Sequence, residues 1–119
     1  MTTSDDKIER MVELVRKGEI TVFVRRAHDF EAADLADVLA ALEEKERVAV
    51  VRALPAELSS HALAEMPEDA HAGETLAALD PERAAEIVEE LEDDDAADIL
   101  GELPFAQQER ILKEVEDRS

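Results

Sequence analysis

The chain has 119 residues, with 13 basic and 32 acidic side chains and no cysteine. This length favours one domain with a modest core, and the lack of cysteine excludes disulfides, a thiol nucleophile and a thiolate zinc site. No apolar run approaches the roughly 18 residues of a membrane-spanning helix, and residues 1–17 lack the apolar block of a signal peptide, so we expect a soluble, cytoplasmic chain.

Acidic residues are concentrated in the second half of the chain. Residues 1–52 carry 9 basic and 12 acidic side chains, a net charge of −3, whereas residues 53–119 carry 4 and 20, a net charge of −16. Such a surface repels nucleic acid and anionic membranes, and it attracts cations or a basic protein face. It equally suits a solvated helical surface whose carboxylates only keep the protein soluble.

The composition favours helices, because Ala, Leu and Glu dominate while tryptophan and tyrosine are absent. Ser4 is the predicted N-cap of a first helix, which Gly18 ends. Residues 19–28 include apolar residues with strand propensity, but the sequence offers no partner strand, so we predict a second helix there. Asp29 is the predicted N-cap of a third helix, whose apolar stripe includes Phe30.

A repeat of about 12 residues runs through the rest of the sequence. Each unit closes with an apolar residue. A pair of residues, mostly aliphatic, lies three and four positions before it, and this spacing places all three side chains on one helix face. The closing residues are Leu42, Leu54, Met66, Leu79, Leu91, Leu103 and Val115. Proline directly follows three of them and would break a continuing helix, so each unit should be one three-turn helix and a short turn.

Two units carry more specific predictions. In the helix predicted over residues 43–54, the valines should face inward, while Lys45, Arg47 and Arg52 face mostly outward. The unit that contains Gly73 also has one extra residue, which predicts a local irregularity.

Acidic residues mark the starts of later helices. Asp80 should cap the helix that begins with Pro81, and Asp93 or Asp94 should cap the next one. Residues 105–115 should form the last helix of the set.

Helices of this length cannot bury their apolar stripes alone. Successive antiparallel neighbours that stack at a fixed step would bury a continuous core between them. We therefore predict an all-α fold, an armadillo-like α-solenoid in which short antiparallel helices form a right-handed superhelical stack. Residues 1–119 should form a single domain, with residues 1–7 and 117–119 frayed or part of a linker.

Catalytic signatures are missing from the sequence, so we do not expect an enzyme. It has no phosphate-binding glycine loop and no HExxH pair, and the run DDDAADIL lacks the glycine and the distal glutamate of an EF-hand loop. His28, His61 and His71 lack a serine or carboxylate constellation suited to catalysis. His61 should be an ordinary surface histidine rather than a ligand.

Two stretches of the chain resemble a known family. The strings DPERAAEIVEELEDDDAADILGELP (residues 80–104) and FEAADLADVLAALEEKERVAVVRALP (residues 30–55) are similar to the cytoplasmic N domain of MgtE-type magnesium channels. The resemblance covers about residues 8–117 and includes the repeated phrase, the prolines at unit ends and a DDxAD pattern over residues 94–98. It implies a right-handed superhelix of short helices, which in that family precedes a pair of CBS domains and a membrane pore.

The resemblance also implies a function. In that family, magnesium ions lie between acidic residues of the N domain and of the CBS domains, offset their repulsion and keep the pore closed when magnesium is plentiful. The matching metal contacts are Asp94 and Asp98, with Asp95 beside them, whereas a further acidic position of the family falls on His61. Because half of the ligands would come from the CBS domains, we expect Mg²⁺ to bind this domain only weakly by itself.

The implied partners are the CBS domains of the same chain, in a dimeric full-length protein at the cytoplasmic face of the cell membrane. We expect no nucleic acid partner and no membrane insertion by this segment. Since the chain has neither CBS domains nor membrane helices, it cannot conduct magnesium itself. We expect it to be a fragment of a longer protein rather than a free-standing regulator.

Other interpretations remain open. Asp94 could serve only as a helix cap, and Asp98 only as a surface acid on the same side. The chain could also be a metal-independent scaffold like the helical stacks of the flagellar motor switch protein FliG, although the charged motor helix and the EHPQ motif of that family are absent. A third interpretation, a mimic of nucleic acid that binds a basic partner, rests on net charge alone.

Overall fold

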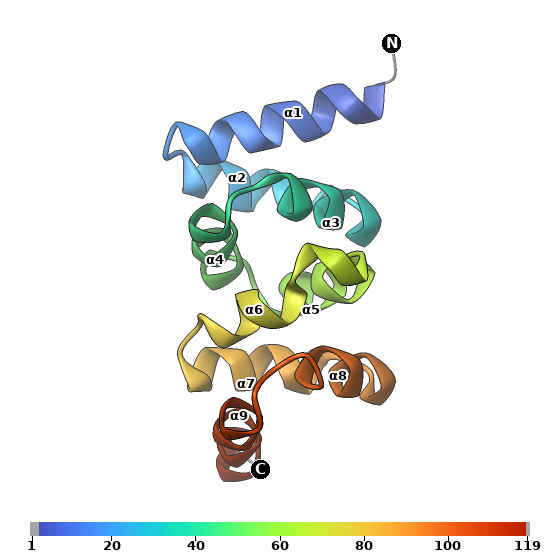
Figure 1. The fold of residues 1–119 in the computed structure, drawn as a ribbon. Helices are drawn as coiled ribbons and strands as arrows, with labels where there is room; N and C mark the ends of the chain where they lie inside the picture. Colours follow the sequence, from blue (N-terminus) through green and yellow to red (C-terminus); the bar gives the residue numbers. More distant parts are fainter. Residues whose placement is uncertain (1–2, 119) are drawn as a thin grey trace.

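The computed structural model describes residues 3–118, with the backbone only for residues 3–5 and 68. This part of the chain contains helices and no strand, which confirms the predicted all-α class. In chain order the elements are α1 (Thr3–Arg16), α2 (Ile20–Ala27), α3 (Ala32–Ala41), α4 (Glu44–Ala53), α5 (Ala56–Glu65), the 3₁₀ helix η1 (Glu68–Ala70), α6 (Ala72–Ala77), α7 (Pro81–Glu90), α8 (Asp93–Leu100) and α9 (Phe105–Arg118). Figure 1 shows α1 at one end of an elongated stack and α9 at the other.

Several helices are joined by two residues of extended backbone. The apolar residues that end α3, α4, α5 and α7 have ψ angles of 144–155° and are at most 9% exposed. These residues are Leu42, Leu54, Met66 and Leu91. Proline follows two of them and disfavours a helical conformation in the residue before it, so the helix must end there. The repeat read from the sequence therefore corresponds to real helix ends, each closed by a core side chain.

The helices pack in two layers, and most of them mainly contact the α-helices that lie two places before or after them in chain order. One layer contains α1, α3, α5, α7 and α9 in sequential contact, and the other contains α2, α4, α6 and α8. This differs from the predicted stacking of successive helices, because each extended connection carries the chain into the opposite layer. The resulting stack measures 45 × 25 × 21 Å and is compatible with a superhelix, whose handedness stays a prediction.

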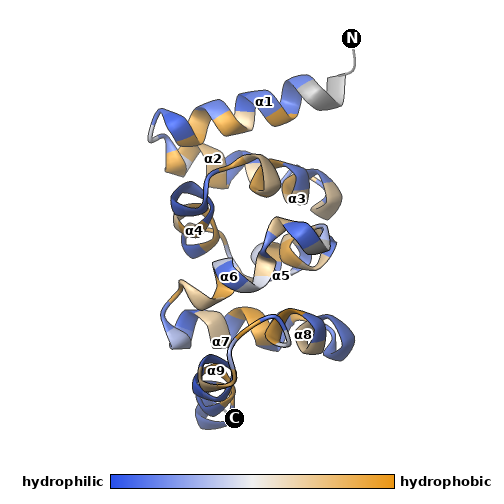
Figure 2. Cartoon of the chain, viewed as in Figure 1, coloured by the Kyte–Doolittle hydropathy of each residue, from blue (hydrophilic) through white to orange (hydrophobic). Residues whose placement is uncertain are grey.

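The core between the layers is aliphatic, and Figure 2 shows hydrophobic residues on helix faces turned toward neighbouring helices. The predicted second helix is confirmed as α2, where Phe23 is fully buried. Its strand-forming residues adopt a helix because a lone strand would leave its backbone groups unpaired, whereas a helix satisfies them internally.

Three predicted caps were wrong. Ser4 lies inside α1, which already includes Thr3. Glu31 rather than Asp29 precedes α3, and Glu92 rather than Asp93 or Asp94 precedes α8. For α8 the reason is the short connection, in which Leu91 closes one helix and the very next residue opens another.

Other helix boundaries were predicted correctly. Gly18 follows α1 with a positive φ of 79°, a conformation that glycine adopts without strain. Asp80 precedes α7 and Pro81 is its first residue, although the Asp80 side chain makes no capping hydrogen bond.

Arg47 is buried, which corrects the prediction that it faces outward. It is 8% exposed, and its guanidinium donates from Nε to the Leu39 carbonyl (3.0 Å) and from Nη2 to the Leu42 carbonyl (2.9 Å). Its Nη1 lies 3.3 Å from the hydroxyl oxygen of Thr75 in α6. The last carbonyls of a helix lack intrahelical partners, so Arg47 supplies donors to the end of α3 and joins three helices. Lys45 and Arg52 are exposed, as predicted.

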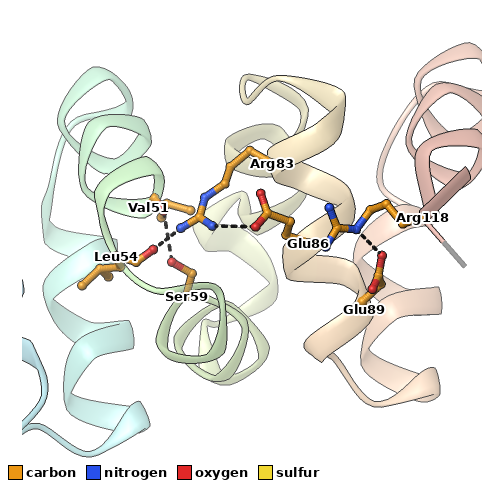
Figure 3. Close-up of polar contacts among 7 residues, drawn as sticks. All are labelled: Val51, Leu54, Ser59, Arg83, Glu86, Glu89 and Arg118. Atoms are coloured by element: carbon orange, nitrogen blue, oxygen red, sulfur yellow. Dashed lines mark hydrogen bonds and ion pairs between the residues drawn. The ribbon is translucent and has the colours of Figure 1, made fainter.

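Further polar contacts link successive parts of the stack, and Figure 3 shows several of them. Arg83 in α7 donates to the carbonyl of Leu54 at the end of α4 and lies 3.6 Å from Glu86. Arg118 near the end of α9 donates to Glu89 in α7 at 2.6 Å. This hydrogen bond raises the pKa of the Arg118 guanidinium.

Candidate functional site

The strongest chemical feature of the structure is the acidic face of α8, which we define as Glu92, Asp93, Asp94, Asp95 and Asp98. All are exposed except the half-buried Asp95. Asp93, Asp94 and Asp95 occupy the first turn of the helix, where the positive end of the helix dipole favours carboxylates. Asp94 and Asp98 are four residues apart and therefore lie on the same side of α8.

The acidic face has no basic partner among the side chains that the structure describes. Within residues 3–118, none of the ion pairs includes one of its five carboxylates. The helix itself contains no lysine or arginine. These carboxylates are thus free to interact with solvent cations or with a positively charged surface.

An open groove runs between α8 and the segment from the end of α5 to α6. Its acidic lining residues are Glu74, Asp95, Asp98 and Glu102, and His71 and several apolar core residues complete it. The structure thus brings Asp95 and Asp98 to one groove, whereas Asp94 lies outside its lining. Of the three predicted metal contacts, only two share this groove.

A close contact between α6 and the end of α8 holds the groove in shape. The Gly73 N–H donates to Glu102 Oε1 at 3.1 Å, so Glu102 satisfies a free donor at the start of α6. A Cβ atom on Gly73 would lie 2.9 Å from Glu102 Cβ and 3.1 Å from the Ile99 carbonyl oxygen, so a larger residue would not fit without movement. The irregularity predicted around Gly73 is confirmed, because η1 and α6 are short and His71 between them has a φ of 65°.

The acidic residues do not form a complete metal site. Across the described part of the chain, no three His, Asp or Glu side chains converge closely enough to hold an ion. Asp94, Asp95 and Asp98 nevertheless supply hard carboxylate oxygens, the ligand type that Mg²⁺ prefers. The donor chemistry therefore suits Mg²⁺, but a complete coordination shell would need further ligands from water or from a second surface.

Sequence reasoning missed several residues around this face. Glu102 and Glu74 line the groove, yet they are 28 residues apart in the sequence, and only tertiary packing brings them together. His61 is exposed as predicted, but it lines a small cleft together with Glu92 and Asp95. The position expected to be acidic in the family thus lies beside the acidic face, with an imidazole in place of a carboxylate.

Comparison with solved structures identifies a similar fold. A chain described as the crystal structure of the soluble part of a magnesium transporter superposes with a TM-score of 0.79 at 20% sequence identity. The match covers 92% of this chain and 43% of that chain, so this chain spans less than half of the solved one. At this identity the likeness shows the fold alone.

Sequence comparison is more specific about the family. No curated protein sequence matches the chain. None of the helices in residues 3–118 is long and apolar enough to cross a membrane. The sequence profile of the family described as the MgtE intracellular N domain, however, matches residues 30–119. This match covers about three-quarters of the sequence, and the chain therefore belongs to the MgtE intracellular N domain family.

Proposed function

We propose that this chain is a cytoplasmic regulatory domain of a magnesium transporter, which senses intracellular Mg²⁺ through the acidic face of α8. The observation that carries the proposal is that this face presents mostly exposed carboxylates that form no ion pair with a basic side chain within residues 3–118, in a chain of the MgtE N domain family. The similar solved chain, whose description names a magnesium transporter, supports the same class of function.

The physical basis is repulsion between two acidic surfaces. Two carboxylates about 4 Å apart in water repel each other by roughly 1 kcal/mol, and several such pairs would keep the domain away from an acidic partner. A divalent cation supplies the positive charge that offsets this repulsion. Asp94, Asp95 and Asp98 would contribute carboxylate oxygens from this chain, and the CBS domains of the transporter would contribute the others.

This arrangement explains why the domain should bind magnesium only weakly by itself. Mg²⁺ keeps several of its waters and demands octahedral geometry, so one or two carboxylates on an open face hold it loosely. Two surfaces that approach each other would complete the shell, and the compact arrangement would favour a closed pore. We propose that this occurs in a dimeric transporter at the cytoplasmic face of the membrane.

A magnesium titration followed by amide NMR tests the proposal directly. We expect shifts at residues 92–98 that saturate with MgCl₂ and exceed those in KCl of equal ionic strength, with CaCl₂ as a second comparison. The variant with Asp94→Asn and Asp98→Asn should lose these shifts. A matched control with Asp34→Asn and Asp37→Asn on α3 removes the same charge elsewhere and should keep them. Shifts no larger than in KCl, or an equal loss in both variants, would argue against an acidic face that binds magnesium.

A second candidate function is a metal-independent scaffold for protein contacts. Its support is that Phe105 and Leu112 on α9 are 72% and 44% exposed, at the end of the stack. Chelation distinguishes the two functions, because a scaffold should bind its partner equally well with EDTA and with magnesium. A metal-dependent contact with purified CBS domains would favour the regulatory function instead.

A further inference from the structure

The segment formed by the end of α1 and by α2 carries a net positive charge, unlike the rest of the sequence. Residues 16–28, which we call the basic end, contain four basic residues and one acidic residue, a net charge of +3. The rest of the sequence carries 9 basic and 31 acidic residues, a net charge of −22. Helix α2 itself has no acidic residue.

Two arginines of the basic end lack acidic partners. Arg16 lies 3.8 Å from Glu46, and Lys17 lies 3.7 Å from Glu13, so these two cations are partly neutralised. Arg25 and Arg26 are exposed, and neither forms an ion pair in the part of the chain that the structure describes. Two adjacent unpaired guanidiniums are unexpected in a chain with 32 carboxylates, and they mark a surface suited to anions.

The basic end is distant from most of the acid. In Figure 1, α1 and α2 lie at one end of the stack, and α8 and α9 lie toward the other. The long axis of the molecule measures 45 Å. The Debye length is about 8 Å at physiological ionic strength, so the charge of the acidic face is largely screened at the basic end. Asp6, Glu9 and Glu13 of α1 line a cleft together with Arg26, so the positive charge at this end is confined to α2 and the residues that flank it.

We propose that the basic end contacts the anionic headgroups of a lipid bilayer. This inference rests on the proposed function, since a domain of a membrane transporter lies close to a bilayer. Guanidinium groups bind phosphate through paired hydrogen bonds, and juxtamembrane basic side chains are attracted to anionic leaflets. The half-buried Ile20, Val22 and Val24 give α2 a partly apolar surface beside its arginines. The contact orients the acidic face away from the bilayer, toward the rest of the transporter.

Vesicle co-sedimentation tests this contact with the 119-residue chain. The chain should sediment with vesicles of 70% phosphatidylcholine and 30% phosphatidylserine in 0.1 M KCl, and much less with pure phosphatidylcholine. The variant with Arg25→Gln and Arg26→Gln should lose binding on the order of tenfold or more. The matched control with Lys45→Gln and Arg52→Gln removes the same charge from exposed positions on α4 and should bind like the parent chain.

Three outcomes would overturn the inference. They are no preference for anionic vesicles, an equal loss in both variants, and binding that survives 1 M KCl. If the surface formed by Arg25 and Arg26 binds an acidic protein segment instead of lipid, the chain will show no preference for anionic vesicles. The two tests are independent, because neither variant changes α8 and the NMR titration uses no lipid. Magnesium shifts at residues 92–98 without vesicle binding would therefore leave the proposed function intact while this inference fails.

Discussion

Individual polar residues hold the helix ends of this domain, and Arg47 is the clearest example. Removal of its guanidinium would leave the buried Leu42 carbonyl without its donor and would take the second donor from the Leu39 carbonyl, which also accepts from the Leu42 N–H at 3.2 Å. The Thr75 hydroxyl would lose its contact with Nη1 and keep its hydrogen bond to the His71 carbonyl. We therefore expect Arg47→Met to lower the free energy of unfolding by about 2–4 kcal/mol, measured by urea denaturation with circular dichroism. Arg52→Met, at an exposed position of the same helix, should change it by less than about 0.5 kcal/mol. Equal effects would show that the buried hydrogen bonds contribute little.

The residue scale is also where sequence reasoning reached its limit. The outward position predicted for Arg47 followed from helical periodicity, which does not account for a carbonyl acceptor in α3 or a hydroxyl 28 residues away in α6. The same holds for Gly73 and Glu102, whose contact spans 29 residues. Such contacts depend on how the two layers of helices stack, and no local sequence pattern predicts them.

Helices and their ends were predictable because local chemistry determines them. Apolar spacing and proline position each act within one turn, so the closing residues Leu42, Leu54, Met66 and Leu91 could be read directly. The N-caps of α3 and α8 could not, because glutamates precede these helices where aspartate, a stronger capping residue, was expected. For α8 the two-residue connection leaves Glu92 as the cap, whereas for α3 the four residues 28–31 place Asp29 two positions too early. The acidic face was visible as a charge run, but its neighbours across the groove come from another part of the chain.

At the element scale, α8 depends on a few apolar contacts under its acidic face. Only Ile99 and Leu100 are buried among its eight residues, and Leu100 is 7% exposed. Leu100→Ala should lower the free energy of unfolding by about 2–5 kcal/mol, because it leaves a cavity in the core. Leu112→Ala is a matched control on α9, where the side chain is 44% exposed, and it should cost far less. If urea denaturation gave the two variants the same stability, the stacking of α8 on the core would need to be reconsidered.

At the scale of the whole molecule, charge is distributed unevenly along the stack, with the acidic face toward one end and the basic end at the other. Helices α2, which carries Arg25 and Arg26, and α8, which carries most of the acidic face, are the two terminal helices of one layer. A domain with this polarity can meet a cation-bridged acidic partner at one end and an anionic surface at the other. The helices between them set the distance between the two ends, which grows with the number of repeats.

The net charge of −19 also makes the stability of the whole fold depend on salt. Folding concentrates like charges, and the Debye length falls from about 30 Å at 0.01 M to about 3 Å at 1 M ionic strength, so added KCl should screen the repulsion. If screening contributes about 1 kcal/mol, Tm should rise by about 4 °C across this range in circular dichroism melts. A flat or falling Tm would contradict net repulsion as a destabilising force. At equal ionic strength, MgCl₂ should raise Tm beyond KCl only through site binding. That excess should vanish in the variant with Asp94→Asn and Asp98→Asn while its response to KCl persists, which separates recognition of the ion from simple screening.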